Sequence, residues 1–263
     1  MSQYTTLRVT PDARGVVTVT MDRPEVRNAF DPVLIEELTQ VATGLAADAG
    51  VRVVVLTGAG EVFSTGADLN WMKAMKAYSH EENVADSTRL DGMFRALWDL
   101  PQPLIGRIMG HALGGGTGLT AVCDIAIATD TASFGFTEVL LGLAPAVISP
   151  YVVRKTSLSF ARSVFVTGER FSAARAREAG LVHEVVAVDA IDAAVEAAVQ
   201  RCLAAGPHAV AAAKRLPEIA LQDLDVAAAQ TVQIIAGLRA SDEGQEGMTA
   251  FFERRTPGWV SEG

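Results

Sequence analysis

The feature of this sequence that most constrains its fold is an alternation of short apolar runs with helical segments. Residues 51–60, VRVVVLTGAG, form a continuous apolar run that ends in glycine, which is the pattern of a strand buried on both faces. Residues 103–110 repeat this pattern, and residues 30–50 have helical periodicity with Asp31 as a candidate N-cap. Because strands that alternate with helices form mostly parallel sheets covered by those helices, the sequence predicts an α/β fold.

The second half of the chain has a different pattern. From about Ser172 it is helical apart from a short run at 181–186, with three alanine-rich amphipathic segments at residues 188–206, 208–225 and 227–255. We therefore predict a core over residues 1–200 and a helical region over residues 201–263. Such a region packs against a neighbouring subunit or folds back on its own core.

Composition narrows the class of protein. The formal net charge of −9 disfavours a general nucleic-acid partner, because phosphate binding needs a basic face. No apolar run reaches the roughly 20 residues of a membrane span, and the first residues lack the apolar segment of a secretion signal. Cys123 and Cys202 lie in apolar surroundings and are expected to be free thiols. We predict a cytoplasmic protein without a membrane partner, and no metal site, because the histidines and cysteines lack ligand spacing.

Two glycine-containing loops lie where a strand pattern changes to a helical one. The first surrounds Gly66 in STGADLNWM, and the second is LGGGTGL at residues 113–119. One explanation is close packing of strand and helix. The other is a ligand, because N–H groups at a helix start are unused, and two of them aimed at one oxygen form an oxyanion hole. The phosphate-loop, dinucleotide-binding and nucleophile-elbow glycine motifs are all missing from the sequence.

Four motifs follow one another along the chain: VFSTGADLNWM at 62–72, GHALGGGTGLTAVCDIAIA at 110–128, FGFTEVLLGLAP at 134–145 and EGMTAFFERRTPGW at 246–259. In this order they resemble the motifs of the crotonase superfamily, the enoyl-CoA hydratase/isomerase family. The resemblance implies a spiral of ββα units and a helical C-terminal region that builds trimers or dimers of trimers. It also implies a coenzyme A thioester as substrate, with no cofactor beyond the CoA of that substrate.

The resemblance also implies roles for particular residues. The backbone N–H groups of Ala67 and Gly115 would bind the thioester oxygen. The segment RPEVRNAF would line the CoA channel, which makes Arg27 and Ala29 candidates, although Arg27 is equally well explained as a solvated surface charge. In the tail, Phe251 and Arg254 match positions that reach a neighbouring subunit's CoA. The same motifs supply the other candidates for substrate contact: Thr65, Gly66, Asp68, Leu69, Gly114, Gly118 and Thr137.

Some of these polar residues also have a plainly structural explanation. Asp68 is placed to cap the helix that starts beside it. His111, before the glycine run, is expected to be a partly buried structural histidine, and Asp124 to hold backbone at the start of a strand.

The resemblance leaves one candidate residue for acid–base catalysis, Glu138. Family hydratases of the best-known type use two glutamates, one after the glycine run and one in a motif similar to FGFTE. Here the first position is Gly118 and the second is Glu138. Because Glu138 lies in apolar sequence, its carboxyl is expected to have a raised pKa, which suits a group that takes and gives a proton near neutrality.

A single carboxylate leaves several reactions open. It is enough to move a proton between C2 and C4 of a 3-enoyl-CoA, as in family isomerases, and it can also activate water. Residues 137–155 look like the branch that hydrates branched or glutaconyl-type CoA thioesters. The sequence therefore predicts an enoyl-CoA hydratase, with a Δ3,Δ2-enoyl-CoA isomerase as the alternative. A non-catalytic acyl-CoA-binding relative, or a thioester hydrolase or decarboxylase on the same scaffold, remains open.

Overall fold

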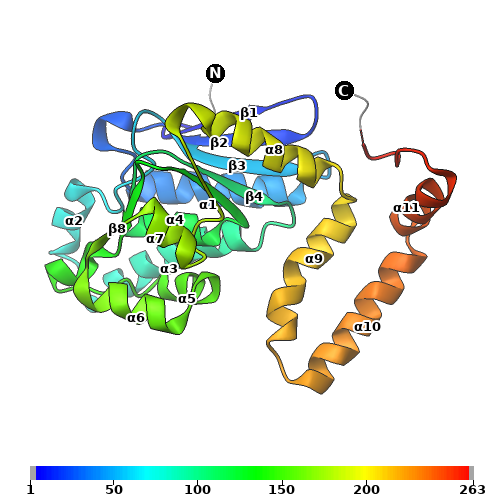
Figure 1. Ribbon diagram of the computed structural model, residues 1–263. Helices are drawn as coiled ribbons and strands as arrows, with labels where there is room; N and C mark the ends of the chain where they lie inside the picture. The colour runs from blue at the N-terminus through cyan, green and yellow to red at the C-terminus, as the bar shows by residue number, and fades with distance from the viewer. Residues whose placement is uncertain (1–3, 261–263) are drawn as a thin grey trace.

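A computed structural model describes residues 4–260 (Figure 1), so the outermost residues of both predicted regions, 1–3 and 261–263, lie outside it. The strands are β1 (Leu7–Pro11), β2 (Val16–Met21), β3 (Val53–Gly58), β4 (Leu104–Ile108), β5 (His111–Leu113), β6 (Ile125–Thr129), β7 (Ser133–Gly135), β8 (Arg170–Ser172) and β9 (Glu184–Val186). The α-helices are α1 (Pro32–Ala47), α2 (Leu69–Met75), α3 (His80–Trp98), α4 (Gly115–Val122), α5 (Ser149–Lys155), α6 (Leu158–Thr167), α7 (Ala173–Glu178), α8 (Ile191–Leu203), α9 (Pro207–Ala220), α10 (Leu224–Ala240) and α11 (Asp242–Glu253). Three short 3-10 helices complete the chain: η1 (Pro24–Val26), η2 (Thr137–Leu141) and η3 (Val188–Ala190).

The strands form two sheets. A six-stranded sheet has the order β1-β2-β3-β4-β6-β9, in which only the β1–β2 pair is antiparallel. A smaller sheet has the order β5-β7-β8, with β5 parallel to β7 and β8 antiparallel to β7. The predicted α/β class with mostly parallel strands is therefore confirmed.

Helices cover both faces of the larger sheet. Val53 and Val55 of β3 point to one face, where Ile191 and Val195 of α8 pack on them. The intervening Val54 and Leu56 belong to the larger apolar cluster on the other face, which includes side chains of α1, α3 and α4. Figure 1 shows α8 on one side of the sheet and those three helices on the other. Burial on both faces explains why β3 reads as an unbroken apolar run.

The local signals for helix starts are confirmed at two places. Asp31 caps α1, where its side chain accepts a hydrogen bond from the Leu34 N–H at 2.8 Å. Asp68 caps α2 by accepting from the N–H of Asn70 at 2.7 Å. Both caps satisfy backbone donors that the first turn of a helix leaves unused.

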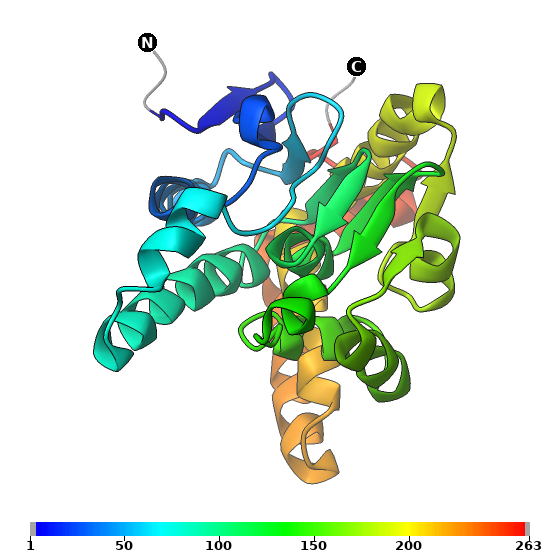
Figure 2. The ribbon, with the colours of Figure 1, turned by 90° about the vertical axis from the view of Figure 1, so that its left-hand side faces the viewer.

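Helices α9, α10 and α11 extend from the core as an arm (Figures 1 and 2). The guanidinium of Arg52 fastens the arm to the start of β3, because it donates to the carbonyls of Leu203, Ala205 and Trp259 at 3.2, 2.8 and 3.0 Å. The predicted helical C-terminal region is thus present within the described residues, and its role in assembly stays a prediction. No helix within residues 4–260 is both long and apolar enough to cross a membrane.

Several elements escaped the sequence analysis. Strands β5 and β8 have three residues each, which is too short for a periodic pattern. The region between Leu69 and Trp98 contains two helices, α2 and α3, because Ser79 and Glu82 form a capping box that starts α3. The last amphipathic segment is likewise divided, by Ser241 between α10 and α11.

We expect Asp31→Ala to lower the free energy of unfolding by about 1–2 kcal/mol, because the variant loses the cap of α1. Asp31 also lies 2.9 Å from the guanidinium of Arg23, so that contact disappears as well. Urea unfolding measures the change. The exposed Asp225 in the first turn of α10 provides the control, and Asp225→Ala should change stability by less than about 0.5 kcal/mol. Equal stability of the two variants would contradict the capping role.

Candidate active site

The candidate site lies where parallel backbone segments end together. Ser64 forms a parallel bridge with Ala112 of β5, and β5 pairs in parallel with β7, with Leu113 opposite Gly135. Parallel segments have their carboxyl ends at the same edge, where α/β proteins bind ligands. Three pieces of chain leave this edge: the loop that contains Gly66, the glycine run after β5, and η2 after β7.

Two glycines allow these pieces to touch. Gly66 has φ +81°, and a Cβ there would lie 2.9 Å from the Leu113 carbonyl oxygen and 3.3 Å from the Gly115 amide nitrogen. Gly114 has φ +51°, and a Cβ there would lie 3.1 Å from Oε1 of Glu138. Both positive φ angles strain any larger residue, a Cβ at Gly66 would also be too close to backbone, and one at Gly114 would press on the Glu138 carboxylate. The structure therefore brings the two glycine loops and Glu138 together at the shared edge.

Within residues 4–260, the backbone N–H groups of Ala67 and Gly115 have no hydrogen-bond acceptor at this edge. Phe30 and Ala67 form a parallel bridge in which Phe30 donates to the Gly66 carbonyl at 2.6 Å and accepts from the Asp68 N–H at 2.7 Å. Neighbouring residues of an extended chain point their amides to opposite sides, so the Ala67 N–H faces away from Phe30. Gly115 is the first residue of α4, where backbone N–H groups have no partner within the helix.

Glu138 is partly buried, and its environment is apolar. Burial raises the pKa of the Glu138 carboxyl, while a hydrogen bond from its own backbone N–H acts in the opposite direction. Its Oε2 atom is buried and has no hydrogen-bond partner among the described residues. A carboxyl that is poorly solvated and has a free oxygen can accept and return a proton near neutral pH.

Two buried polar residues hold the first loop in place. Asn28 has φ +53°, and its side-chain amide donates to the carbonyls of Ala59 and Val62 at 2.9 and 2.7 Å. The hydroxyl of Ser64, which is fully buried, donates to the Asn28 carbonyl at 2.8 Å. Sequence reasoning missed both residues, because their partners lie far along the chain.

A third buried residue joins the glycine run to the strand that leads to Glu138. The Thr117 hydroxyl in α4 lies 2.6 Å from the Ala112 carbonyl oxygen and 3.0 Å from that of Gly135. The Gly114 N–H also donates to the Gly135 carbonyl, at 2.8 Å. These bonds fix the position of η2, and hence of Glu138, relative to Gly114.

Arg23 organises the loop that was predicted to line a CoA channel. It lies 2.9 Å from the Asp31 carboxylate and 3.3 Å from that of Asp68, and it donates to the Ala29 carbonyl. Within that loop Ala29 is buried, whereas the side chain of Arg27 is exposed. Arg27 therefore has the solvent access that binding a phosphate requires, and Asp68 serves the structure as a cap and an ion-pair partner.

The remaining candidates are placed as follows. Thr65 and Thr137 are half-buried close to the edge, and Leu69 is exposed at the start of α2. His111 bonds through Nδ1 to the Ser133 hydroxyl at 2.8 Å within the smaller sheet, as expected for a structural histidine. Phe251 and Arg254 lie in the exposed arm, at the opposite end of the molecule from α2, so a single chain does not bring them to the site (Figure 1).

Gly118 does not line an open site. Gly118 is buried within α4, and a Cβ on it would collide with Cγ2 of Ile148. The same Cβ would lie 3.0 Å from Cβ of Ile148 and 3.1 Å from the Phe94 ring. The position where a second glutamate was sought is therefore filled by apolar side chains.

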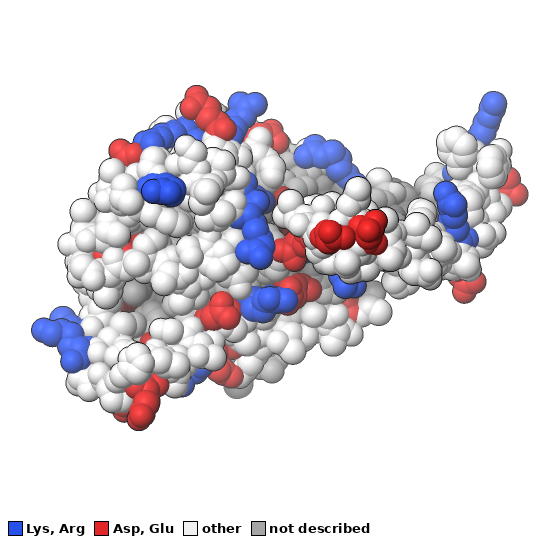
Figure 3. All heavy atoms as spheres, turned by 90° about the horizontal axis from the view of Figure 1, so that it is seen from below, with Lys and Arg blue, Asp and Glu red and all other residues white. Residues whose placement is uncertain are grey.

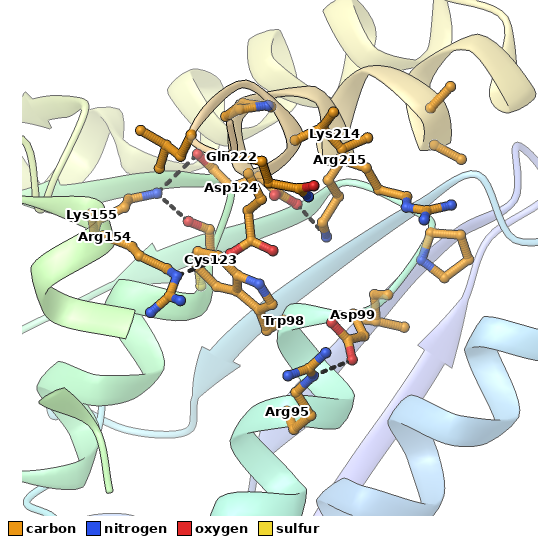
Figure 4. Close-up of a pocket in the computed structure, with 18 of the residues that line it drawn as sticks. Arg95, Trp98, Asp99, Cys123, Asp124, Arg154, Lys155, Lys214, Arg215 and Gln222 are labelled. Atoms are coloured by element: carbon orange, nitrogen blue, oxygen red, sulfur yellow. Dashed lines mark hydrogen bonds and ion pairs between the residues drawn. The ribbon is translucent and has the colours of Figure 1, made fainter. Parts of the chain in front are cut away.

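A cavity of about 1010 Å³ lies elsewhere, between the arm and the ends of α3, α4 and α5 (Figure 4). Most of its charged groups already have protein partners. Lys214 contacts Asp124 at 2.7 Å, Arg154 contacts Glu218 at 3.1 Å, and Lys155 donates to backbone carbonyls. Seen from below, basic and acidic side chains alternate where the arm leaves the core (Figure 3). We therefore assign no chemistry to this cavity.

The Asp124 side chain also accepts a hydrogen bond from the Leu104 N–H at 2.7 Å, as expected for a residue that holds the start of a strand.

Comparisons with known proteins agree with this fold. The model of the enoyl-CoA hydratase/isomerase family matches residues 12–262. The 2,3-dehydroadipyl-CoA hydratase of Escherichia coli is 33% identical over 251 residues, which cover 92% of this chain and 94% of that protein. Among solved structures, Pseudomonas aeruginosa AtuE superposes with a TM-score of 0.94 at 34% identity, covering 98% of this chain and 100% of that one. An enoyl-CoA hydratase from Shewanella pealeana gives 0.92 at 39% identity, covering 98% and 97%.

The chain therefore belongs to the enoyl-CoA hydratase/isomerase family, and the predicted membership of the crotonase superfamily is confirmed. It is an enzyme of the hydratase/isomerase type, for which the family implies a CoA-thioester substrate.

We expect Gly114→Ala to reduce kcat at least about 100-fold, because the new methyl group would displace the Glu138 carboxylate. Gly92→Ala is the matched control. Gly92 lies in α3 with nothing within 4 Å of a Cβ, so this substitution should keep activity and raise stability by up to about 1 kcal/mol. Steady-state kinetics with an enoyl-CoA that the enzyme turns over compares the two variants. Full activity of Gly114→Ala would show that close approach of position 114 to Glu138 is dispensable.

Proposed function

We propose that this enzyme hydrates a 2-enoyl-CoA thioester of branched or glutaconyl type, with Glu138 as its single acid–base residue. The observation that carries the proposal is the position of a partly buried carboxyl with a free oxygen beside Gly114, the N-cap of α4, where a Cβ would lie 3.1 Å from Oε1 of Glu138. The names of the Escherichia coli and Shewanella pealeana relatives, both hydratases, support it.

In the proposed mechanism the thioester oxygen accepts hydrogen bonds from the amides of Ala67 and Gly115. These donors stabilise the negative charge that develops on this oxygen when the conjugated double bond is attacked. Glu138 removes a proton from water as the water oxygen bonds to C3, and C2 then takes the proton back from Glu138. The reaction needs no metal and no cofactor besides the CoA of the substrate.

Isomerisation of a 3-enoyl-CoA is the second candidate, and the apolar surroundings of Gly118 favour it. A proton shift needs one base and no held water. Glu138 would remove a proton from C2, the oxyanion hole would stabilise the dienolate, and Glu138 would return the proton at C4.

We also propose that the arm assembles the protein into trimers or dimers of trimers. The arm exposes large apolar side chains that a partner would cover, among them Leu221, Leu224, Phe251 and Phe252. Assembly would give Phe251 and Arg254 a route to a neighbouring subunit's substrate. A cytoplasmic location is part of the proposal, supported by the two free thiols, of which Cys123 is buried.

Three substrates distinguish the candidates: crotonyl-CoA, 3-hexenoyl-CoA and 3-methylglutaconyl-CoA. Loss of the absorbance of the conjugated thioester marks hydration, and we expect it with 3-methylglutaconyl-CoA. A gain of that absorbance from 3-hexenoyl-CoA marks isomerisation instead. Tight binding of all three with no turnover of any would refute both reactions and favour an acyl-CoA-binding role.

We expect Glu138→Gln to lower kcat at least about 1000-fold while the Kd for the thioester changes less than about threefold, because the variant keeps the size but loses the base.

In the unmodified enzyme the working form of Glu138 is the carboxylate, and burial raises its pKa. In a plot of kcat against pH, activity should therefore rise around a pKa above the usual glutamate pKa of about 4.3. The plot for the variant should lack this rise. Glu178→Gln, in the exposed turn of α7, is the control. Retained activity of the Glu138 variant would remove this residue from the mechanism.

A further inference from the structure

The surroundings of Gly118 explain why this site has one carboxylate. The Gly118 N–H donates to the Gly114 carbonyl at 3.1 Å, so Gly118 lies one helical turn along α4 from Gly114. Gly114 in turn lies close to Glu138, because a Cβ on Gly114 would be 3.1 Å from Oε1 of that residue. One turn is about 5.4 Å, a span comparable to the length of an extended glutamate side chain, so position 118 is near enough to Gly114 for such a side chain to cover the distance.

Two apolar side chains take that room. Ile148, just before α5, is buried with its Cγ2 and Cβ against Gly118, and the Phe94 ring from α3 closes the contact. Phe94 is itself held between Phe30 and Tyr151, with ring centroids 6.3 and 6.0 Å away. Ile148 is fixed through its backbone, because its carbonyl accepts from the N–H groups of Tyr151 and Val152 at 3.2 and 3.1 Å.

We propose that Ile148, supported by Phe94, is the residue that limits this site to a single carboxylate. The inference rests on the proposed function, in which Glu138 alone moves protons. Position 118 accepts a side chain only when residue 148 is small, so Gly118 and Ile148 form a reciprocal steric pair. By keeping that side of α4 apolar, Ile148 excludes a second water-holding acid and thereby determines which reactions the enzyme can perform.

The packing is tested first, by thermal unfolding of Gly118→Ala, Ile148→Ala and the double variant. We expect Gly118→Ala to lower Tm by about 5 °C or more, although alanine is the better helix former, because its methyl group meets Ile148. Gly92→Ala, in open space, should not lower Tm. The double variant should lose less than the sum of the two single losses. A Gly118→Ala protein as stable as Gly92→Ala, or additive losses, would overturn the proposal.

The functional consequence is tested with Gly118→Glu/Ile148→Ala against the matched pair Gly118→Gln/Ile148→Ala. The two double variants have side chains of nearly equal size and differ in one charge. We expect the pKa of Glu138, measured by ¹³C NMR of labelled glutamate, to be about one pH unit higher in the Glu variant, because like charges raise it. Crotonyl-CoA hydration should be about tenfold or more faster in the Glu variant than in the Gln variant.

Failure of this inference and failure of the proposed function give different results. Equal Glu138 pKa values in the two double variants would show that position 118 does not reach the site, and would overturn the role of Ile148. An unmodified enzyme that turns over no enoyl-CoA would overturn the proposed function. The unfolding cycle and the NMR titration would still decide whether Ile148 keeps a second acid away from Glu138.

Discussion

The site depends on parallel pairing between short segments that end at one edge. Ser64 pairs with Ala112, and β5 pairs with β7, so the chain leaves the edge three times within a few ångströms. The backbone can approach this closely only because Gly66 and Gly114 have no Cβ and adopt positive φ angles. A side chain at either glycine would separate the amides of the edge from the carboxylate of Glu138.

Maintaining this arrangement uses buried polar groups. Asn28, Ser64 and Thr117 each satisfy backbone carbonyls that the irregular loops would otherwise leave unpaired in the interior. Oε2 of Glu138 differs, because it is buried without a hydrogen-bond partner among the described residues, as are Nε1 of Trp71 and Oε1 of Gln102. An unsatisfied buried acceptor costs about 1–3 kcal/mol, and proteins tolerate such a cost where the group has chemical work to do.

Positions 138 and 118 differ in their neighbours, and this difference bears on how many acidic groups the site can hold. Both positions adjoin the glycine run, and one carries a carboxylate while the other is covered by Ile148 and Phe94. In the proposed mechanism, the size of the buried side chain at position 148 decides whether position 118 can carry a second acid beside Glu138. In the proposed assembly, a second chain would cover the exposed apolar residues of the arm.

The sequence by itself determined the class of fold, because apolar runs and helical periodicity report burial directly, and it located Glu138, both glycine loops and the Asp31 cap. It did not show β5 or β8, whose three residues are too few for periodicity. Tertiary structure alone decided what surrounds each site residue. Ser64 reaches Asn28 across 36 residues of sequence and Thr117 reaches Gly135 across 18, and only the folded chain sets Ile148 on Gly118. Contacts between distant segments leave no local pattern, because each side chain is compatible with its own element and acquires its role only when the elements pack.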